Sequence, residues 1–559
     1  MHSPNEAAAS TAPGKRPDAL LAFLAYSILA AAVLWPLPSA PAKLALPYPD
    51  TYVNVWSLAW VAHQALADPL HPFDSNAYHP HPRSLAYAES LLPQSLQAAP
   101  VIWLGGSPLL AYNLVLLLTF PLSGLGAYLL AREMSGSRAG AFMAGLAYSL
   151  CTYRYYHLVH LQAVSAQWFP FALLYLGRAI DAPRLRHFLA LGFFSVLQAL
   201  SSVYYAVFLG PTLLVALLYR FRAALQSRTL LRVTLTLALA AGLVAFALFP
   251  HRRIQADHRL ARSRDAAIHW SARWSSYLDP GQYVALPHLV WLRARFAEVQ
   301  PLYPGLGALL LGAVGAVSAR RPGPARLACL LTGTSVLLSL GPELQLGPLL
   351  LPGPFEAMRT LPGVSGLRAP GRMGVVALLG LALLAAIGWS RLARSGRGWL
   401  WAAALVASLM AVESFPAGLH HNIRLAALPP PFAHWLAQAP RGPVLELPWN
   451  EDEESALYLY WSTAHWQPMV NGYASFQPPG NRGLGLIGAH FPRPYASRVL
   501  RENGVRYVVV HADRVKPAQR ARLQAMEDLP EGVKLAVILG QDWVFSLDPL
   551  PGPETGTGG

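Results

Sequence analysis

Long apolar runs alternate with short polar and basic segments along most of this chain. Runs near the length that crosses the hydrocarbon core of a bilayer predict about eleven transmembrane helices. The run from 188 to 219 is too long for one span, and we expect it to divide near Ser201 and Ser202. The pattern therefore predicts an α-helical polytopic membrane protein. The predicted spans are 19–37, 108–131, 138–153, 162–179, 187–203, 204–220, 229–250, 302–319, 325–341, 371–391 and 398–415.

Arginines between the spans predict the orientation. With the N-terminus inside, every inner loop is basic, as the positive-inside rule requires. Segment 1–18 is then a disordered cytoplasmic tail, and the C-terminal region lies outside. The outer loops of the membrane domain, 19–415, are 38–107, 251–301 and 342–370. In a bacterium this outer face is the periplasmic face of the inner membrane. The inner arginines are Arg132, Arg138, Arg178, Arg184, Arg186, Arg220, Arg222, Arg228, Arg232, Arg320, Arg321, Arg326, Arg391, Arg394 and Arg397.

The pattern changes at about residue 416, where short strands and helices replace the long apolar runs. Alternating and β-branched segments predict strands, and amphipathic segments predict helices. We expect a soluble α/β domain over 416–550 and a disordered tail over 551–559. The expected strands are 444–447, 506–510, 535–539 and 543–547, and the expected helices are a short one within PPPFAHWLAQAPRGP before the first strand, 453–464, 495–502 and 517–526.

Composition agrees with this architecture and excludes several classes of protein. Hydrophobic residues make up 54% of the chain and charged residues only 13%, as in membrane proteins. The net charge of +15 comes from short loops and not from a basic stripe, so we expect no nucleic-acid partner. Cys151 and Cys329, the only cysteines, fall inside predicted spans, which leaves no disulfide framework. Loops and motifs typical of nucleotide hydrolases, serine hydrolases and zinc proteases are absent from the sequence.

Two acids of the first outer loop are candidates for catalysis. Asp50 follows the first span beside Trp56 and Trp60, and a carboxylate held in such surroundings can act as a general base. The alternative is that Asp50 caps a helix. Glu89 is the second acid; the pair could share a divalent metal or divide base and orienting roles, or Glu89 could start the following helix. The nearby histidines have irregular spacing, so we expect no zinc site.

Basic and polar residues of the outer face are candidates for binding an anion. Guanidinium groups match phosphate oxygens and stay charged near lipid. The alternative for the arginines of 251–301 is a solvated surface that touches anionic headgroups, and for the others it is the anchoring of helix ends at the interface. The candidates are Arg252, Arg253, Arg259, Arg262, Arg368, Arg372, Arg154, His157 and His160.

Several stretches resemble one known family. The first span and its large outer loop with an early Asp are followed by AYNLVLLLTFPLSGLGAYLLAREMSGSRAGAFMAGLAYS, YRYYHLVHLQAVSAQWFP and GLRAP. Over 19–415 these resemble bacterial membrane glycosyltransferases of the GT-C fold, and more narrowly poorly characterised relatives of the lipopolysaccharide galacturonosyl- and mannosyl-transferring branch. The stretch VNGYASFQPP at 470–479 resembles the soluble end of the same relatives.

The resemblance implies transfer of a sugar from a polyprenyl-phosphate donor to a glycan or lipid acceptor at the periplasmic face of the cell envelope. It assigns the general base to Asp50 and makes Glu89 the second acid. The family's usual pattern has adjacent acids, whereas Thr51 follows Asp50 here. We therefore expect an inverting mechanism without a metal, although a divalent cofactor stays open. The alternative function is a non-catalytic protein that binds, exports or assembles lipid-linked glycans on the same membrane fold.

Overall fold

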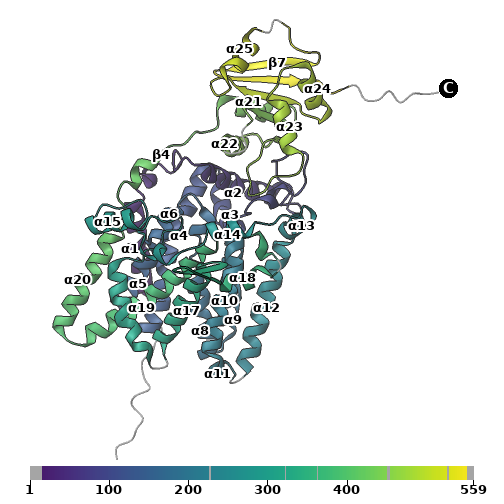
Figure 1. The fold of residues 1–559 in the computed structure, drawn as a ribbon. Helices are drawn as coiled ribbons and strands as arrows, with labels where there is room; N and C mark the ends of the chain where they lie inside the picture. Colours follow the sequence, from purple (N-terminus) through teal and green to yellow (C-terminus); the bar gives the residue numbers. More distant parts are fainter. Residues whose placement is uncertain are drawn as a thin grey trace, which may run out of the picture.

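The computed structural model describes residues 16–225, 228–320, 323–361, 363–449, 453–525 and 528–550. Most of the expected N-terminal tail, the expected C-terminal tail and Arg321 lie outside these residues. The described chain forms a bundle of long helices, a middle layer of loops and short helices, and an α/β domain beyond that layer (Figure 1).

A helix of the bundle overlaps each predicted span, but the helices differ in length. Within the described residues, three are long and apolar enough to cross a membrane: 108–135, 229–247 and 370–394. Several others are shorter, so the number of spans and the N-in orientation stay predictions. The bundle helices are α1 (Arg16–Val33), α4 (Pro108–Ser135), α5 (Arg138–Ser149), α8 (Trp168–Asp181), α9 (Leu185–Ser201), α10 (Val203–Tyr219), α12 (Thr229–Ala247), α16 (Leu306–Ala316), α17 (Pro324–Ser339), α19 (Gly374–Arg394) and α20 (Arg397–Glu413).

The long apolar run divides where the sequence predicts. Helix α9 ends at Ser201, and Ser202 has an extended backbone with φ −163° and ψ 141°. The Ser202 hydroxyl accepts the backbone N–H of Tyr204, which caps the start of α10. The two helices therefore meet at the middle layer, where the backbone N–H groups at the start of α10 can donate to partners from the loops.

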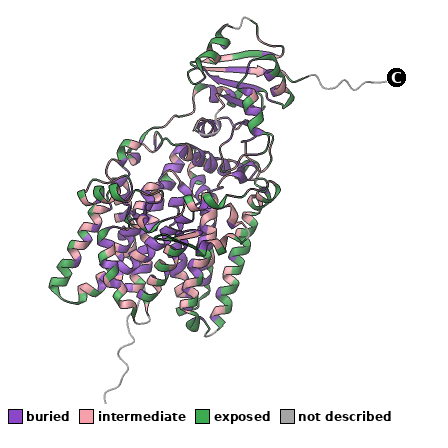
Figure 2. Ribbon diagram, viewed as in Figure 1, coloured by how far each residue is buried: buried purple, intermediate pink, exposed green. Residues whose placement is uncertain are grey.

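The burial pattern of the bundle is that of a protein surrounded by lipid. Buried residues lie along the central helices, while α12 and α20 expose long faces (Figure 2). On α12, Leu231, Leu235, Leu239 and Leu243 are each more than half exposed. Because they recur every four residues, they form one apolar stripe. Such a stripe is unfavourable in water and favourable against acyl chains.

Helix α19 is the centre of the bundle and packs against α5, α16 and α17. Its backbone touches that of α16, since a Cβ on Gly315 would overlap the Leu384 carbonyl and one on Gly388 would overlap the Leu311 carbonyl. Small residues allow membrane helices this close approach. Helix α19 is therefore fixed along its length against α16.

Arginines of the predicted inner loops gather at the end of the bundle opposite the α/β domain. Arg178 of α8 pairs with Glu133 of α4 at 2.8 Å. Arg394 donates to the Ser135 carbonyl at 3.2 Å and so joins the ends of α19 and α4. The grouping agrees with the alternation of inner and outer loops along the chain. Helix α11 (Phe221–Ala224) also lies at this end (Figure 1), and the 3-10 helix η5 (Val317–Arg320) follows α16.

The middle layer is built from the three predicted outer loops and from short segments between bundle helices. It includes a two-stranded antiparallel hairpin, β2–β3, in the third loop, which the sequence analysis did not predict. Its elements are η1 (Leu37–Ser39), β1 (Leu44–Ala45), α2 (Pro49–Ala67), η2 (Ser84–Tyr87), α3 (Leu92–Trp103), α6 (Thr152–Tyr156), α7 (Leu161–Val164), α13 (Phe249–Asp257), α14 (Arg264–His269), η4 (Trp274–Leu278), α15 (Pro287–Arg295), β2 (Glu343–Leu346), β3 (Leu349–Pro352), α18 (Pro354–Arg359), η6 (Val364–Gly366), η7 (Pro370–Met373), η8 (Leu419–Asn422) and β4 (Arg424–Leu425).

The α/β domain has a four-stranded sheet in the order β5-β6-β8-β7. Strands β5 and β6 are parallel, and the other neighbours are antiparallel. The strands coincide with the four segments predicted from the sequence, whereas helix α23 was not predicted. The elements are α21 (Pro431–Gln438), β5 (Val444–Leu447), α22 (Glu453–Ser462), α23 (Asn481–Gly488), α24 (Pro494–Glu502), β6 (Tyr507–His511), α25 (Pro517–Ala525), β7 (Val533–Leu539) and β8 (Asp542–Leu547).

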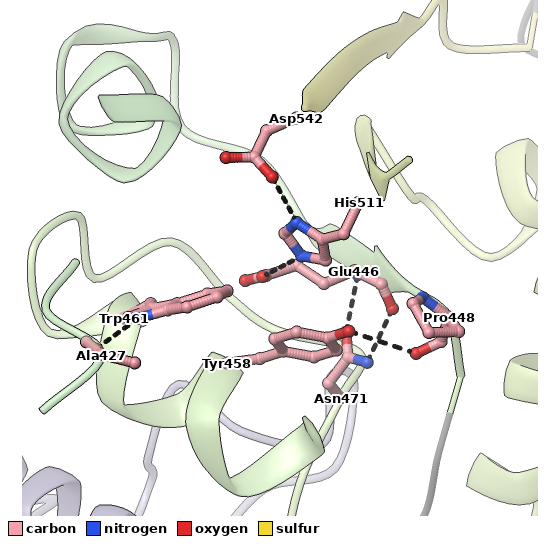
Figure 3. A network of polar contacts seen from close by, with 8 residues as sticks. All are labelled: Ala427, Glu446, Pro448, Tyr458, Trp461, Asn471, His511 and Asp542. Atoms are coloured by element: carbon pink, nitrogen blue, oxygen red, sulfur yellow. Dashed lines mark hydrogen bonds and ion pairs between the residues drawn. The ribbon is translucent and has the colours of Figure 1, made fainter. Parts of the chain in front are cut away.

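A buried histidine links three parts of this domain (Figure 3). His511 of β6 contacts Asp542 of β8 through Nδ1 at 2.7 Å and Glu446 of β5 through Nε2 at 3.0 Å. The rings of Tyr458 and Trp461 on α22 lie 5.0 and 5.5 Å from its ring. The network therefore joins the sheet to α22.

Helix α22 also packs against α2, so the α/β domain is docked on the first outer loop. Asn76 of that loop donates to the Ser462 hydroxyl at 3.0 Å and accepts the indole N–H of Trp56 at 2.9 Å. Farther along, the Tyr78 backbone N–H donates to the Asn471 carbonyl at 3.2 Å. Side-chain and backbone bonds thus both cross this contact.

Candidate functional site

Arg372 lies at the centre of the polar residues of the middle layer. It belongs to η7, just before α19, and only 8% of its surface is exposed. Its guanidinium lies 4.6 Å from the centroid of the Tyr204 ring. Burial raises the pKa values of both Asp50 and Glu89, and the charge of Arg372 opposes the shift in both carboxyls. One buried cation thus acts on both acids that the sequence singled out.

Asp50 lies in the first turn of α2 and is not the residue that caps it. The cap position is Tyr48, and no side chain makes the capping bond. Burial is the largest cause of the raised pKa of Asp50, and both Arg372 and Arg368 act in the other direction. The carboxylate lies 3.7 Å from Nε2 of His160, and 36% of the side chain is exposed. Asp50 is therefore a partly exposed carboxylate with no close ion pair, on which the charges of Arg372 and Arg368 act.

His160 is uncharged beside this carboxylate. Burial and the charges of Arg372 and Arg368 lower the pKa of His160 to about 3. A neutral imidazole at 3.7 Å makes no ion pair with Asp50. His157 lies next to it, with the two Nδ1 atoms 3.5 Å apart, and its Nε2 is 3.4 Å from Oε1 of Gln300. The two histidines therefore add no positive charge beside Asp50, and the cations that act on its carboxylate are Arg372 and Arg368.

Glu89 is held by the start of a helix far away in the sequence. Its carboxylate accepts the Ser202 hydroxyl at 3.1 Å and the Val203 backbone N–H at 3.0 Å. These are the first groups of α10, where free backbone N–H groups and the helix dipole favour an anion. Glu89 does not cap the following helix α3, whose cap position is Leu91. The acid therefore joins the first outer loop to the break between α9 and α10.

Glu89 also lines a cavity of about 120 Å³ between the bundle and the α/β domain. Its walls mix aromatic rings, amide and imidazole groups, and two arginines, a set of groups that suits sugar hydroxyls and phosphate oxygens. Asp50 is not one of the lining residues. These are Ala86, Tyr87, Ala88, Glu89, Val203, Tyr204, His251, Ile254, Gln255, Leu260, Arg262, Gly363, Gly366, Leu367, Arg368, Ser475 and Phe476.

The arginines of the cavity have no carboxylate partner at ion-pair distance in the described part of the chain. Other arginines of the outer loops do: Arg264 pairs with Glu343 and Arg293 with Asp279, both at 2.6 Å. Arg368 lies over the Trp270 ring, 5.5 Å from its centroid, and Arg262 over the Phe476 ring at 4.3 Å. Aromatic faces support these cations without neutralising them. Among the residues that line the cavity, two arginines therefore stand against one carboxyl group, that of Glu89, which is bound to the start of α10.

The remaining arginine candidates lie elsewhere. Arg252 and Arg253 are on the exposed side of α13, and Arg253 is 3.8 Å from Asp257. Arg259 is exposed two residues beyond the helix end, with a φ of 50°. None of the three lines the cavity. Ile254 is buried on the other side of α13, so helical periodicity turns these arginines away from the cavity.

Arg154 is buried inside the bundle and positions the loop of the two histidines. It donates to Ser123 at 3.0 Å, Thr119 at 2.7 Å and the Val164 carbonyl at 2.7 Å, and only 1% of its surface is exposed. It therefore fixes the short helices α6 and α7 to α4. These short helices interrupt two of the predicted spans, so α5 ends at Ser149 and α8 begins at Trp168.

The acids and histidines do not assemble a divalent-metal site. No group of three or more His, Cys, Asp or Glu residues lies close enough to hold an ion, within the residues that the structure describes. Asp50 has one imidazole at 3.7 Å, and Glu89 is occupied by the start of α10. Divalent cations need several ligands around one point.

Some residues of the site were not singled out from the sequence. Tyr204 lies under Arg372, and its hydroxyl accepts the backbone N–H of Arg368 at 3.3 Å. Its place beside the Ser201–Ser202 break was the available signal. His251 and Gln255 line the cavity from α13, and Phe476 lines it from the VNGYASFQPP stretch. For these three, no local pattern in the sequence marks the residue.

A family described as "Domain of unknown function (DUF6311)" matches residues 100–413. The chain belongs to this family. The matched segment contains His160, Arg262, Arg368 and Arg372 and begins after Asp50 and Glu89. No curated protein matches the sequence.

Solved structures similar to this chain are membrane glycosyltransferases. Arabinofuranosyltransferase AftD from Mycobacteria has a TM-score of 0.60 at 15% identity, covering 95% of this chain and 40% of AftD. ArnT from Cupriavidus metallidurans has a TM-score of 0.50 at 15% identity, covering 96% of this chain and all of ArnT (100%). The Archaeoglobus fulgidus oligosaccharyltransferase has a TM-score of 0.50 at 14% identity, covering 89% and 70%.

These similarities confirm the expected fold at its general level. The chain has the GT-C fold of these membrane glycosyltransferases, and three helices of its described part are long and apolar enough to cross a membrane. It spans less than half the length of AftD. At identities of 15% or less the likeness shows the fold alone. The narrower resemblance to lipopolysaccharide-modifying transferases stays a prediction.

Proposed function

We propose that this protein is a glycosyltransferase that moves a sugar from a polyprenyl-phosphate donor to a glycan or lipid acceptor. One observation carries the proposal: in the middle layer beside a GT-C bundle, burial raises the pKa values of two carboxyls, and the charge of the same buried arginine, Arg372, acts on both. Transfer from a lipid phosphate requires a base and fixed cations near the leaving group. Asp50 and the arginine group supply both.

In the proposed reaction, Asp50 takes the proton of an acceptor hydroxyl as its oxygen attacks the anomeric carbon. The bond between that carbon and the phosphate oxygen breaks, and its electron pair leaves with the lipid phosphate. Attack opposite the leaving group inverts the configuration. Burial, which raises the pKa of Asp50, makes the carboxylate a stronger base. Neutral His160 leaves it free to accept a proton.

The proposed phosphate site consists of Arg372, Arg368 and Arg262. Negative charge grows on the departing phosphate, where preorganised cations stabilise the transition state most. Glu89 is proposed to orient this group, because its carboxylate fixes the start of α10, which carries Tyr204 under Arg372. Arg154 is proposed to hold the segment that places His157 and His160 beside Asp50. We propose that exposed Arg252, Arg253 and Arg259 meet anionic headgroups.

The proposed location is the bacterial inner membrane, with the middle layer and the α/β domain on the periplasmic side. The exposed apolar stripe of α12 supports contact with acyl chains. Arginine-rich inner loops at the opposite end support the orientation. A lipid-linked donor would then reach the site from the outer leaflet.

A transfer assay in membranes tests the proposal with labelled polyprenyl-phosphate sugars as donors. We expect Asp50→Asn to lower turnover by at least about 100-fold, the typical contribution of a general base. Asp68→Asn is the matched control, because this acid of the same loop is 47% exposed and pairs only with His71 among the ion pairs of the described residues. Unchanged turnover in Asp50→Asn would remove Asp50 as the base.

One observation favours a second candidate function. Asp50 does not line the cavity that contains Glu89, Arg262 and Arg368. A non-catalytic protein that binds, exports or assembles lipid-linked glycans needs the cavity and not the base. It would bind polyprenyl phosphate equally well with Asp50→Asn and would release no labelled product in either form.

A further inference from the structure

Arg262 lies where three separate parts of the chain meet. Its backbone N–H donates to the Ser365 carbonyl at 3.1 Å, in the segment that leads to Arg368. Its Nη2 donates to the Ser475 carbonyl of the α/β domain, and its guanidinium lies over the Phe476 ring, 4.3 Å from the centroid. The side chain of a cavity arginine is therefore held by the α/β domain.

The segment that holds Arg262 is itself fixed. Just before it, a Cβ on Gly472 would overlap the ring of Tyr78, so the backbone lies directly against the first outer loop. The Asn481 side chain donates to the Val470 carbonyl at 2.8 Å and fixes the same segment from the other side. Ser475 and Phe476 therefore extend from an anchored backbone toward the cavity that they line.

The contact leaves Arg262 able to bind an anion. A guanidinium has five N–H donors in one plane. Stacking on Phe476 covers a face of that plane, and the Ser475 carbonyl accepts from one nitrogen. Burial and the neighbouring charge of Arg368 lower the pKa of Arg262. The two arginines line the same cavity and neither pairs with a carboxylate among the described residues, so an anion bound there would relieve their repulsion.

We propose that the α/β domain is a part of the phosphate site, because Ser475 and Phe476 hold Arg262 in position to bind a lipid phosphate across the two domains. The inference rests on the proposed function, and it assigns the cavity to the phosphate group of a polyprenyl lipid. Phe476 is a positioning residue that acts through Arg262. Displacing the α/β domain would remove this wall of the site.

The test measures binding of undecaprenyl phosphate to the full chain in lipid nanodiscs. Arg262→Ala is expected to weaken binding about tenfold, the loss of one charge-assisted contact. Phe476→Ala is expected to weaken it several-fold, and Phe476→Tyr to keep wild-type affinity. The double variant Arg262→Ala with Phe476→Ala should bind within about twofold of Arg262→Ala alone, since Phe476 acts through the arginine.

Tyr495→Ala is the matched control, because this ring is 48% exposed on α24 of the same domain and does not line the cavity. Unfolding temperatures of all variants separate loss of fold from loss of binding. Bound undecaprenyl phosphate should also slow protease cleavage within residues 416–430, which connect the bundle to the α/β domain. This protection is expected in the wild type but not in Phe476→Ala.

The outcomes distinguish this inference from the proposed function. If Arg372→Ala weakens binding and the Arg262 and Phe476 variants do not, the inferred role of Ser475 and Phe476 in holding Arg262 for the phosphate is wrong. The proposed binding of the phosphate by Arg372 is then kept. Additive losses in the double variant would also overturn it, because Phe476 would then act independently of Arg262. If the wild type binds no undecaprenyl phosphate, both this inference and the proposed function are wrong.

Discussion

The ring of Tyr52 on α2 stacks on the ring of Tyr460 on α22, with centroids 5.4 Å apart and planes 13° apart. This pair joins the first outer loop to the α/β domain, beside the hydrogen bonds of Asn76. The loop that carries Asp50 and the domain that carries Phe476 are thus one packed unit, and the geometry of the site depends on their contact.

Loss of this stack should loosen the α/β domain. Truncating a buried aromatic ring costs about 3–5 kcal/mol, so Tyr460→Ala should expose 416–430 to protease faster than the wild type. Tyr460→Phe keeps the ring and should show wild-type cleavage. Equal cleavage of all forms would mean that the stack does not hold the domain.

The pH dependence of transfer should report the charges around Asp50. A base must be deprotonated, so kcat/KM should fall as the pH falls through the raised pKa of Asp50, above its ordinary value of 3.8. Arg368 favours the carboxylate, and its removal should raise that pKa further. Arg368→Gln should therefore move the acid limb to higher pH.

Arg253→Gln is the control for that experiment. Arg253 is exposed on α13 beside Asp257 and is absent from the charges that act on Asp50. Its acid limb should overlay that of the wild type. An acid limb that moves to lower pH in Arg368→Gln would contradict the arrangement.

The α/β domain should lose stability as the pH rises above neutral. Burial lowers the pKa of His511, but Asp542 and Glu446 raise it more, and the net pKa is raised from 6.5. A raised histidine pKa gives stability that is complete below the unfolded value and lost as the pH rises through the folded value. Burial also raises the pKa of Glu446, which acts in the same direction.

Thermal unfolding followed by tryptophan fluorescence measures this effect. His511→Gln should flatten the decrease of unfolding temperature with pH and should lower stability by about 3–5 kcal/mol near pH 6, since it leaves the carboxylates of Glu446 and Asp542 without their cation. A wild-type unfolding temperature that rises between pH 6 and 9 would contradict a charged His511.

Arg154→Lys should lower activity more than stability. The guanidinium reaches three acceptors on α4 and α7, which one ammonium group cannot match. The Thr119 and Ser123 hydroxyls keep their bonds to Leu116 and Thr119 carbonyls. We expect about a tenfold loss of kcat, from a displaced loop of His157 and His160, with a small change in unfolding temperature. A loss of stability alone would assign Arg154 to folding.

The sequence predicted features that depend on local pattern. Apolar runs located the bundle helices, alternation located the four strands, and the polar break at Ser201 and Ser202 separated α9 from α10. Each rests on neighbours within one element. The short helices α6 and α7 were missed, because the predicted spans 138–153 and 162–179 were extended to residues that the structure places in these helices, beyond the end of α5 at Ser149 and before the start of α8 at Trp168.

Long-range partners could not be predicted from pattern. Glu89 binds residues 113 and 114 positions away, and the acid looks the same in the sequence whether it faces α3 or α10. Arg262 and Arg252 belong to one basic loop, but only Arg262 lines the cavity. Which side of α13 faces the bundle is decided by packing, with Ile254 as the one local sign.

The contact between Gly315 and α19 has a consequence for how a substrate is admitted. Because the backbones of α19 and α16 are in contact, α19 could slide or rotate only by separating from α16. Arg372, which directly precedes α19, is therefore held in a fixed position. The position of Arg262 depends instead on a contact between domains, because Ser475 and Phe476 of the α/β domain hold its side chain. In the proposed function, a donor phosphate therefore meets one arginine set by the bundle and a second set by the docking of the α/β domain.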